Sequence, residues 1–158
     1  MTQTPRPARD WSWTPSPIMN RVMSTILRLP LAHRMLSSMM LLITFTGRKS
    51  GKQYTTPVGY LRDGNRVYIL TKRFRAWWHN FEQPASVTLR IAGQDVSGQA
   101  SAVTDAAAVA QRMTQFIQAR PNDAEIFEVH LLENGQPDPS SLDAVAQKVV
   151  VIEVQLAA

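Results

Sequence analysis

The feature that most constrains this fold is a series of short β-forming runs that occupy residues 40–103. Each run is shorter than a typical helix and is bounded by turn residues. The clearest boundary is the sequence RDGN at residues 62–65, because Asp-Gly and Gly-Asn pairs supply the positive φ angles of a tight hairpin turn. We predict strands over residues 40–45, 55–61, 67–71, 87–91 and 96–103.

Two helices are predicted among and after these strands. A short one begins near Arg75 and ends before Pro84, and a longer one follows residue 103 with Thr104 or Asp105 as its cap. Turn signals mark residues 134–135 and 137–139. The run VVVIEVQL at 149–156 reads as a last strand buried on both faces. Meandering strands with segregated helices predict an α+β domain around a small, mostly antiparallel barrel. The apolar stripe of the longer helix consists of Val109, Met113, Phe116 and Ile117.

The length of 158 residues predicts a single domain. Residues 1–17 hold four prolines and few aliphatic side chains, so we expect an extended or disordered arm. Residues 18–158 would form the domain, including N-terminal helices within 18–38. The chain has no cysteine, which fits a reducing, cytoplasmic compartment and excludes a thiolate nucleophile. Its three histidines are far apart in sequence and match no metal motif, so we expect no metal site.

Charge is distributed unevenly along the chain. Residues 1–100 carry 14 Lys or Arg against 4 Asp or Glu, a net +10, whereas residues 101–158 carry 3 against 8, a net −5. A basic half indicates either an anionic partner or simple solubility. We expect no nucleic-acid partner, because helix-turn-helix, zinc-finger and RRM signatures are absent. The basic, Met-rich segment 18–40 would either contact the inner face of a membrane peripherally or pack on its own domain, the commoner arrangement.

The basic sequence TGRKSGKQYTTP at residues 46–57 resembles a phosphate-binding loop only superficially. Three residues separate its glycines where the P-loop has four, and Thr-Thr-Pro favours extended chain over a helix. It is therefore a strand–turn–strand element, either a solvated hairpin tip or an anion site built from turn N–H groups and cations. If the predicted strands 55–61 and 67–71 pair through the RDGN turn, residues 53–55 lie beside 71–73. That would form a basic groove edged by tryptophan, suited to an anionic planar ligand.

The sequence TGRKSGKQYTTPVGYLRDGNRVYIL, followed by AWWHNF, Pro84 and VTLRIAG, resembles the deazaflavin-dependent nitroreductase family. The similarity covers about residues 40–100, and Tyr54 stands where the family pattern has an arginine. The resemblance implies a split β-barrel of the flavin-reductase or FMN-binding type. It also implies hydride transfer from reduced coenzyme F-420, an 8-hydroxy-5-deazaflavin, to a small hydrophobic quinone or nitro-aromatic acceptor. A homodimer is compatible with it. FMN and haem are less favoured ligands.

Carried over by position, the resemblance assigns cofactor-binding roles to three segments. The basic turn would meet the phosphate and tail carboxylates of the coenzyme, the following strand would lie along its ring, and residues 71–80 would form the other wall. The predicted cofactor-binding residues are Arg48, Lys49, Ser50, Gly51, Lys52, Thr55, Thr56, Pro57, Val58, Thr71, Lys72, Arg73, Trp77, Trp78 and Asn80.

No constellation of nucleophile, base and acid indicates chemistry centred on the protein itself. Tyr60 and Tyr68 are candidates for protonating a reduced substrate, but we interpret both as packing residues of the barrel. His79 is interpreted as a surface residue of the short helix. The alternative function is that of a non-catalytic split-barrel carrier of a flavin, haem or lipid.

Overall fold

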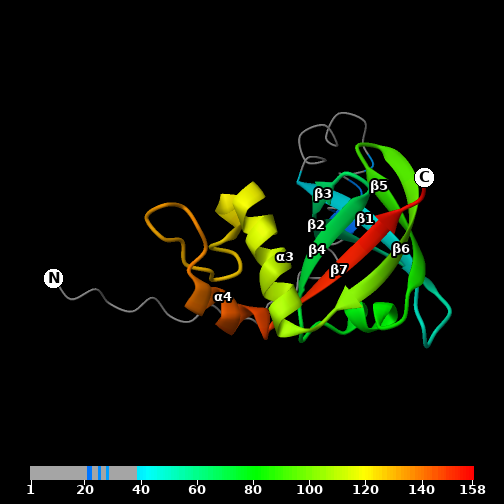
Figure 1. The fold of residues 1–158 in the computed structure, drawn as a ribbon. Coiled ribbons are helices and arrows are strands. Elements are labelled where there is room, and N and C mark those ends of the chain that lie inside the picture. The colour runs from blue at the N-terminus through cyan, green and yellow to red at the C-terminus, as the bar shows by residue number, and fades with distance from the viewer. Residues whose placement is uncertain (1–20, 23–24, 26–27, 29–38) are drawn as a thin grey trace.

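The computed structural model describes residues 21, 22, 25, 28 and 39–158. Seven antiparallel strands form one curled sheet in the order β2-β1-β5-β6-β7-β4-β3, with the helices α3 and α4 gathered on one side of it (Figure 1). The strands are β1 (Met40–Thr46), β2 (Gln53–Gly59), β3 (Leu61–Asp63), β4 (Arg66–Lys72), β5 (Ala85–Ile91), β6 (Gln94–Val103) and β7 (Val149–Leu156). The helices are η1 (Ala76–Phe81) and η2 (Pro121–Asp123), both 3₁₀, and α3 (Ala106–Ala119) and α4 (Pro139–Ala146).

The strand predictions are confirmed except over residues 55–61. There the chain breaks at Tyr60, so that β2 pairs with β1 and only the short β3 pairs with β4. At this break the Arg120 guanidinium donates to the carbonyl oxygens of Tyr60 and Met39, at 2.8 and 2.9 Å. Those acceptors are therefore held by α3's C-terminal end. Of the predicted strand 55–61, only Leu61 pairs with β4. The predicted pairing with residues 67–71 is therefore wrong for residues 55–60.

Hairpin turns form at the predicted RDGN sequence, between β3 and β4, and between β5 and β6. Gly64 takes a φ of 57° between β3 and β4, and Ala92 and Gly93 take 50° and 79° between β5 and β6. Such positive angles suit glycine, which has no Cβ to clash with its own backbone.

The longer predicted helix is confirmed as α3, capped by the Asp105 carboxylate, which accepts from the Ala108 N–H. Its four predicted stripe residues are all buried. The prediction of turns at residues 137–139 missed α4. Asp138 caps that helix by accepting from Ser141, and Pro139 occupies its first turn, where a missing N–H costs nothing. Proline and aspartate here begin a helix.

Two hydrophobic cores lie on opposite faces of the sheet. The inner core fills the curl of the sheet and includes Ile43, Phe81 and Ile152. The outer core lies between the sheet and the helices and includes Met113, Val145 and Val151. Alternate residues of β7 enter the two cores, as predicted for a strand buried on both faces.

The N-terminal predictions fall mostly outside the described residues. Arg21, Val22, Thr25 and Arg28 are helical, and the Thr25 hydroxyl donates to the Arg21 carbonyl at 2.9 Å. The arm at 1–17, the rest of the N-terminal helices within 18–38 and the division of the chain into arm and domain stay predictions. Among the described residues, none of the helices combines the length and hydropathy needed to cross a bilayer.

Replacing Phe81 should destabilise the fold strongly, because its ring is 0% exposed and joins η1 to the inner core. We expect Phe81→Ala to lower the free energy of unfolding by about 3–5 kcal/mol. Phe74→Ala is the matched control, since that ring is 50% exposed and should cost less than about 1 kcal/mol. Urea denaturation followed by circular dichroism measures both, and equal losses would contradict the described packing.

Candidate functional site

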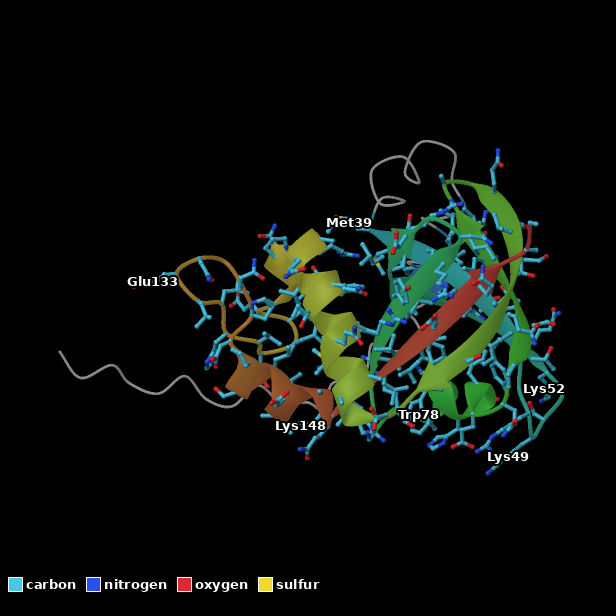
Figure 2. The ribbon with its side chains drawn as sticks, viewed as in Figure 1. Met39, Lys49, Lys52, Trp78, Glu133 and Lys148 are labelled. Atoms are coloured by element: carbon cyan, nitrogen blue, oxygen red, sulfur yellow. The ribbon has the colours of Figure 1, made fainter. Side chains whose placement is uncertain are left out.

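A cavity of about 920 Å³ opens between the β1–β2 turn and the segment that follows β4. Figure 2 shows Lys49 and Lys52 on this turn, which projects beside the short η1 helix. A volume of this size is typical of sites for cofactors and drug-sized ligands. The lining consists of Phe45, Gly47, Arg48, Lys49, Ser50, Tyr54, Thr55, Thr56, Pro57, Val58, Phe74, Arg75, Ala76, Trp77, His79 and Asn80.

The turn itself is held by its own backbone and by Tyr54. The Gly47 N–H donates to Lys52 O at 2.8 Å, and the Gly51 N–H, at a φ of 68°, donates to Gly47 O at 2.9 Å. A Cβ on Gly47 would lie 2.7 Å from the Tyr54 ring and from Ser50 Oγ, so a larger residue here would displace one of these side chains. The Tyr54 hydroxyl is hydrogen-bonded to Ser50 Oγ at 3.1 Å. The residue that replaces the family's arginine therefore supports the turn from within.

Aromatic rings form an apolar surface within the cavity. Phe45 stacks on Tyr54 and lies tilted against Trp77, with ring centroids 5.8 Å apart in each pair. Trp77 is fixed by its indole N–H, which donates to the buried Thr71 hydroxyl at 3.0 Å, and by edge contact with Phe81. Rings held in this way offer flat contact area to a planar ligand.

Four residues, Arg48, His79, Asn80 and Glu82, connect the two walls, and we call them the clasp. The Arg48 backbone N–H donates to Asn80 Oδ1 at 2.8 Å, and its guanidinium donates to Glu82 Oε2 at 3.0 Å. His79 Nδ1 is hydrogen-bonded to the other oxygen of Glu82 at 2.5 Å. The hydrogen bond with His79, with smaller contributions from Arg48, holds the pKa of Glu82 below its ordinary value. Glu82 is therefore an anion shared between Arg48 and His79.

Arg75 is a partly buried cation of the cavity lining. Its Nε atom, like those of Arg73 and Arg90, is buried and has no hydrogen-bond partner among the described residues. Burial lowers the pKa of Arg75 from its ordinary value, because desolvation disfavours the charged form. A buried charge is normally paired. An anionic ligand in the cavity would supply the missing partner.

The structure brings together nine of the predicted site residues on the cavity lining. They are Arg48, Lys49, Ser50, Thr55, Thr56, Pro57, Val58, Trp77 and Asn80.

Six others lie off that lining, namely Gly51, Lys52, Thr71, Lys72, Arg73 and Trp78. For residues 71–73 the reason is that β4 pairs with β7 and the second wall begins after this strand, at Phe74. Gly51 and Lys52 lie on the β1–β2 turn, and Trp78 lies on η1. Thr71 and Trp78 are buried, and the Trp78 indole donates to Arg73 O at 2.8 Å. The Arg73 guanidinium donates to the carbonyl of Thr104, at the entrance to α3. Binding roles for these six stay predictions from the resemblance.

Sequence reasoning left out seven lining residues, which are Phe45, Gly47, Tyr54, Phe74, Arg75, Ala76 and His79. Arg75 lies close in sequence to the predicted site residues Lys72 and Arg73. That its Nε has no hydrogen-bond partner can be seen only in the structure. Tyr60 and Tyr68 are 8% and 4% exposed, consistent with packing roles. Burial is the main cause that raises the pKa of Tyr60. Among the described residues, no group of His, Asp and Glu side chains is arranged to hold a metal ion.

The curled antiparallel sheet is the split barrel of FMN-binding-like proteins. A solved structure described as an F420-H2 dependent reductase, FDR-A, aligns with a TM-score of 0.50 at 16% identity, covering 73% of this chain and 92% of that one. A domain-swapped dimer aligns at 0.52 and 16%, covering 85% and 94%. A chain assigned to a general stress family of Xanthomonas campestris pv. campestris aligns at 0.50 and 15%, covering 92% and 86%. These likenesses establish the fold.

Family membership comes from the sequence. The model of the F420H(2)-dependent quinone reductase family matches residues 22–125, and the chain belongs to this family. It is therefore an oxidoreductase whose cofactor is coenzyme F-420. A search of curated proteins found no significant match. An anionic planar cofactor fits the cavity described above, because aromatic rings and the partly buried Arg75 line the same space.

Proposed function

We propose that this protein uses reduced coenzyme F-420 to reduce a small, planar quinone, with the coenzyme bound in the cavity between the β1–β2 turn and η1. The observation that carries the proposal is the buried, unpartnered Nε of Arg75 beside the aromatic surface of Phe45 and Trp77. Cations and flat rings in one cavity match a ligand with both an anionic group and a planar ring.

Cation contacts to the coenzyme come from two places. Lys49 lies on the turn and Arg75 lies on the opposite wall, so anionic groups between them would contact both. Arg48 is already paired with Glu82, which leaves Lys49 and Arg75 as the better donors. Such charge-assisted hydrogen bonds are stronger than neutral ones.

Strand β2 supplies polar backbone groups for the ring. It pairs only with β1, so the backbone groups on its other edge are not used by the sheet. On that free edge Thr55 offers an N–H donor and Pro57 its carbonyl, because the alternating antiparallel pairs direct the backbone groups of Thr56 and Val58 toward β1. Their place on the cavity lining supports contacts with the polar edge of a bound deazaflavin.

The cofactor determines the chemistry. Reduced coenzyme F-420 supplies a hydride when bound. The quinone gains that hydride and one proton and becomes a hydroquinone. The residues of this chain orient both molecules, and their aromatic side chains exclude water from the contact.

A quinone is favoured as the acceptor by the exposed aromatic side chains of the cavity. Phe74 and Tyr54 are 50% and 46% exposed, and both belong to the lining. Large apolar side chains exposed at a cavity commonly bind an apolar ligand. A nitro-aromatic compound has a similar ring, so the assay below compares the two. The homodimer and peripheral membrane contact stay predictions, and the segment 18–40 lies largely outside the described residues.

Removing a cation from the cavity should weaken coenzyme binding. We expect Lys49→Ala and Arg75→Met each to raise the Kd of oxidised F-420 about tenfold, equivalent to about 1.4 kcal/mol. Lys52→Ala is the matched control, because Lys52 has the same charge on the same turn but lies off the lining. Fluorescence titration measures all three. An equal loss in Lys52→Ala would contradict the distinction drawn by the lining, and would favour either an effect of overall charge or the binding role that the resemblance assigns to Lys52.

The acceptor is tested by steady-state oxidation of reduced F-420 with a soluble naphthoquinone or a nitrobenzene derivative. We expect a higher kcat/KM for the quinone. Phe74→Ala should raise the KM for the quinone about fivefold or more, since an aromatic contact is worth about 0.5–1.5 kcal/mol. Turnover of the nitro compound alone would reject the quinone, and turnover of neither would reject the proposed reaction.

A further inference from the structure

His79, interpreted from the sequence as a surface residue of the short helix, has the features of a ligand contact. Its ring stacks on Trp78 with centroids 3.7 Å apart, and its Nδ1 is bonded to Glu82. These two contacts fix the orientation of the imidazole. Its other nitrogen, Nε2, has no hydrogen-bond partner among the described residues. His79 also belongs to the cavity lining, so the ring is held while one polar atom is left for a ligand.

The surroundings of His79 favour an anion. The charged residues on the cavity lining are Arg48, Lys49 and Arg75, and the lining includes no Asp or Glu. Glu82 is the carboxylate in contact with His79, and Arg48 binds its other oxygen. Glu82 therefore neutralises Arg48 and orients His79 together. Protonation of His79 would add a further positive charge to a cationic cavity, which an anionic ligand would stabilise.

We propose that His79 is a pH-dependent contact for an anionic group of bound coenzyme F-420, with Nε2–H as the donor and Glu82 as the residue that positions the ring. The inference rests on the placement of the coenzyme proposed above. A bound anion favours the imidazolium form, so the coenzyme and a proton bind cooperatively. Affinity must therefore rise as pH falls to the point where the imidazole carries a proton, and decline above it.

The test measures the Kd of oxidised F-420 between about pH 5.5 and about pH 8, a range that brackets the ordinary titration of histidine. Wild type is compared with His79→Gln, which keeps a polar side chain without a titrating group. His130→Gln is the matched control, since His130 is an exposed histidine outside the cavity lining. Titration of the ligand or of other residues is common to the three proteins. The ratio of the Kd values therefore isolates the contribution of His79.

We expect the affinity of wild type and His130→Gln to exceed that of His79→Gln by about fivefold at pH 5.5, with the difference vanishing near pH 8. Calorimetry in two buffers of different ionisation enthalpy should show proton uptake on binding within this pH range that His79→Gln lacks. Parallel pH profiles in wild type and His79→Gln would overturn the inference about His79 alone. Absence of F-420 binding by wild type at every pH would overturn the proposed coenzyme site as well.

Discussion

The burial of β7 on both faces is the constraint on which the rest of this structure depends. Its residues alternate between the inner core and the outer core, and both of its edges are hydrogen-bonded, to β6 and to β4. Each fully buried Val or Ile contributes about 1.5–3 kcal/mol relative to exposure. Pairing of Lys72 with Val149 also fixes where β4 ends. The chain leaves the sheet at that point and forms η1, so the second wall of the cavity is positioned by the most buried strand of the barrel.

The first wall depends on a different set of forces. The β1–β2 turn projects from the edge of the sheet and is held by its own hydrogen bonds, by Tyr54 and by the clasp. Exposed ion pairs such as Arg48–Glu82 are worth little individually. Their value here is geometric, because they hold a cationic turn against an aromatic wall. The buried Arg75 Nε has no hydrogen-bond partner among the described residues and lies on the cavity lining. An anionic ligand bound there would supply that partner.

Local signals predicted much of this fold, because strands, hairpins and α3 are each specified by neighbouring residues. Asp63 and Gly64 make their turn wherever the flanking strands lie, and the stripe on α3 buries itself against any apolar sheet. The pairing of β2 with β1 agrees with the predicted strand–turn–strand element, whereas the end of β2 before Tyr60 was missed, and the carbonyl of Tyr60 is bound by Arg120, a residue far along the chain. The start of α4 was missed because Asp138 and Pro139 suit a turn and a helix cap equally well. Nine predicted site residues line the cavity, whereas Arg75 and His79 were left out because burial and a missing partner are not local properties.

The central claim is that coenzyme F-420 lies against the aromatic surface between the turn and η1. Nitrogen-15 NMR of the indole N–H groups tests it most directly, because the two tryptophans of η1 differ in place. Trp77 lines the cavity and donates to Thr71, whereas Trp78 is buried and donates to Arg73. With signals assigned from Trp77→Phe and Trp78→Phe, titration with F-420 should shift the Trp77 signal strongly and the Trp78 signal much less. A saturating titration that leaves the Trp77 signal unmoved would place the coenzyme elsewhere and contradict the account.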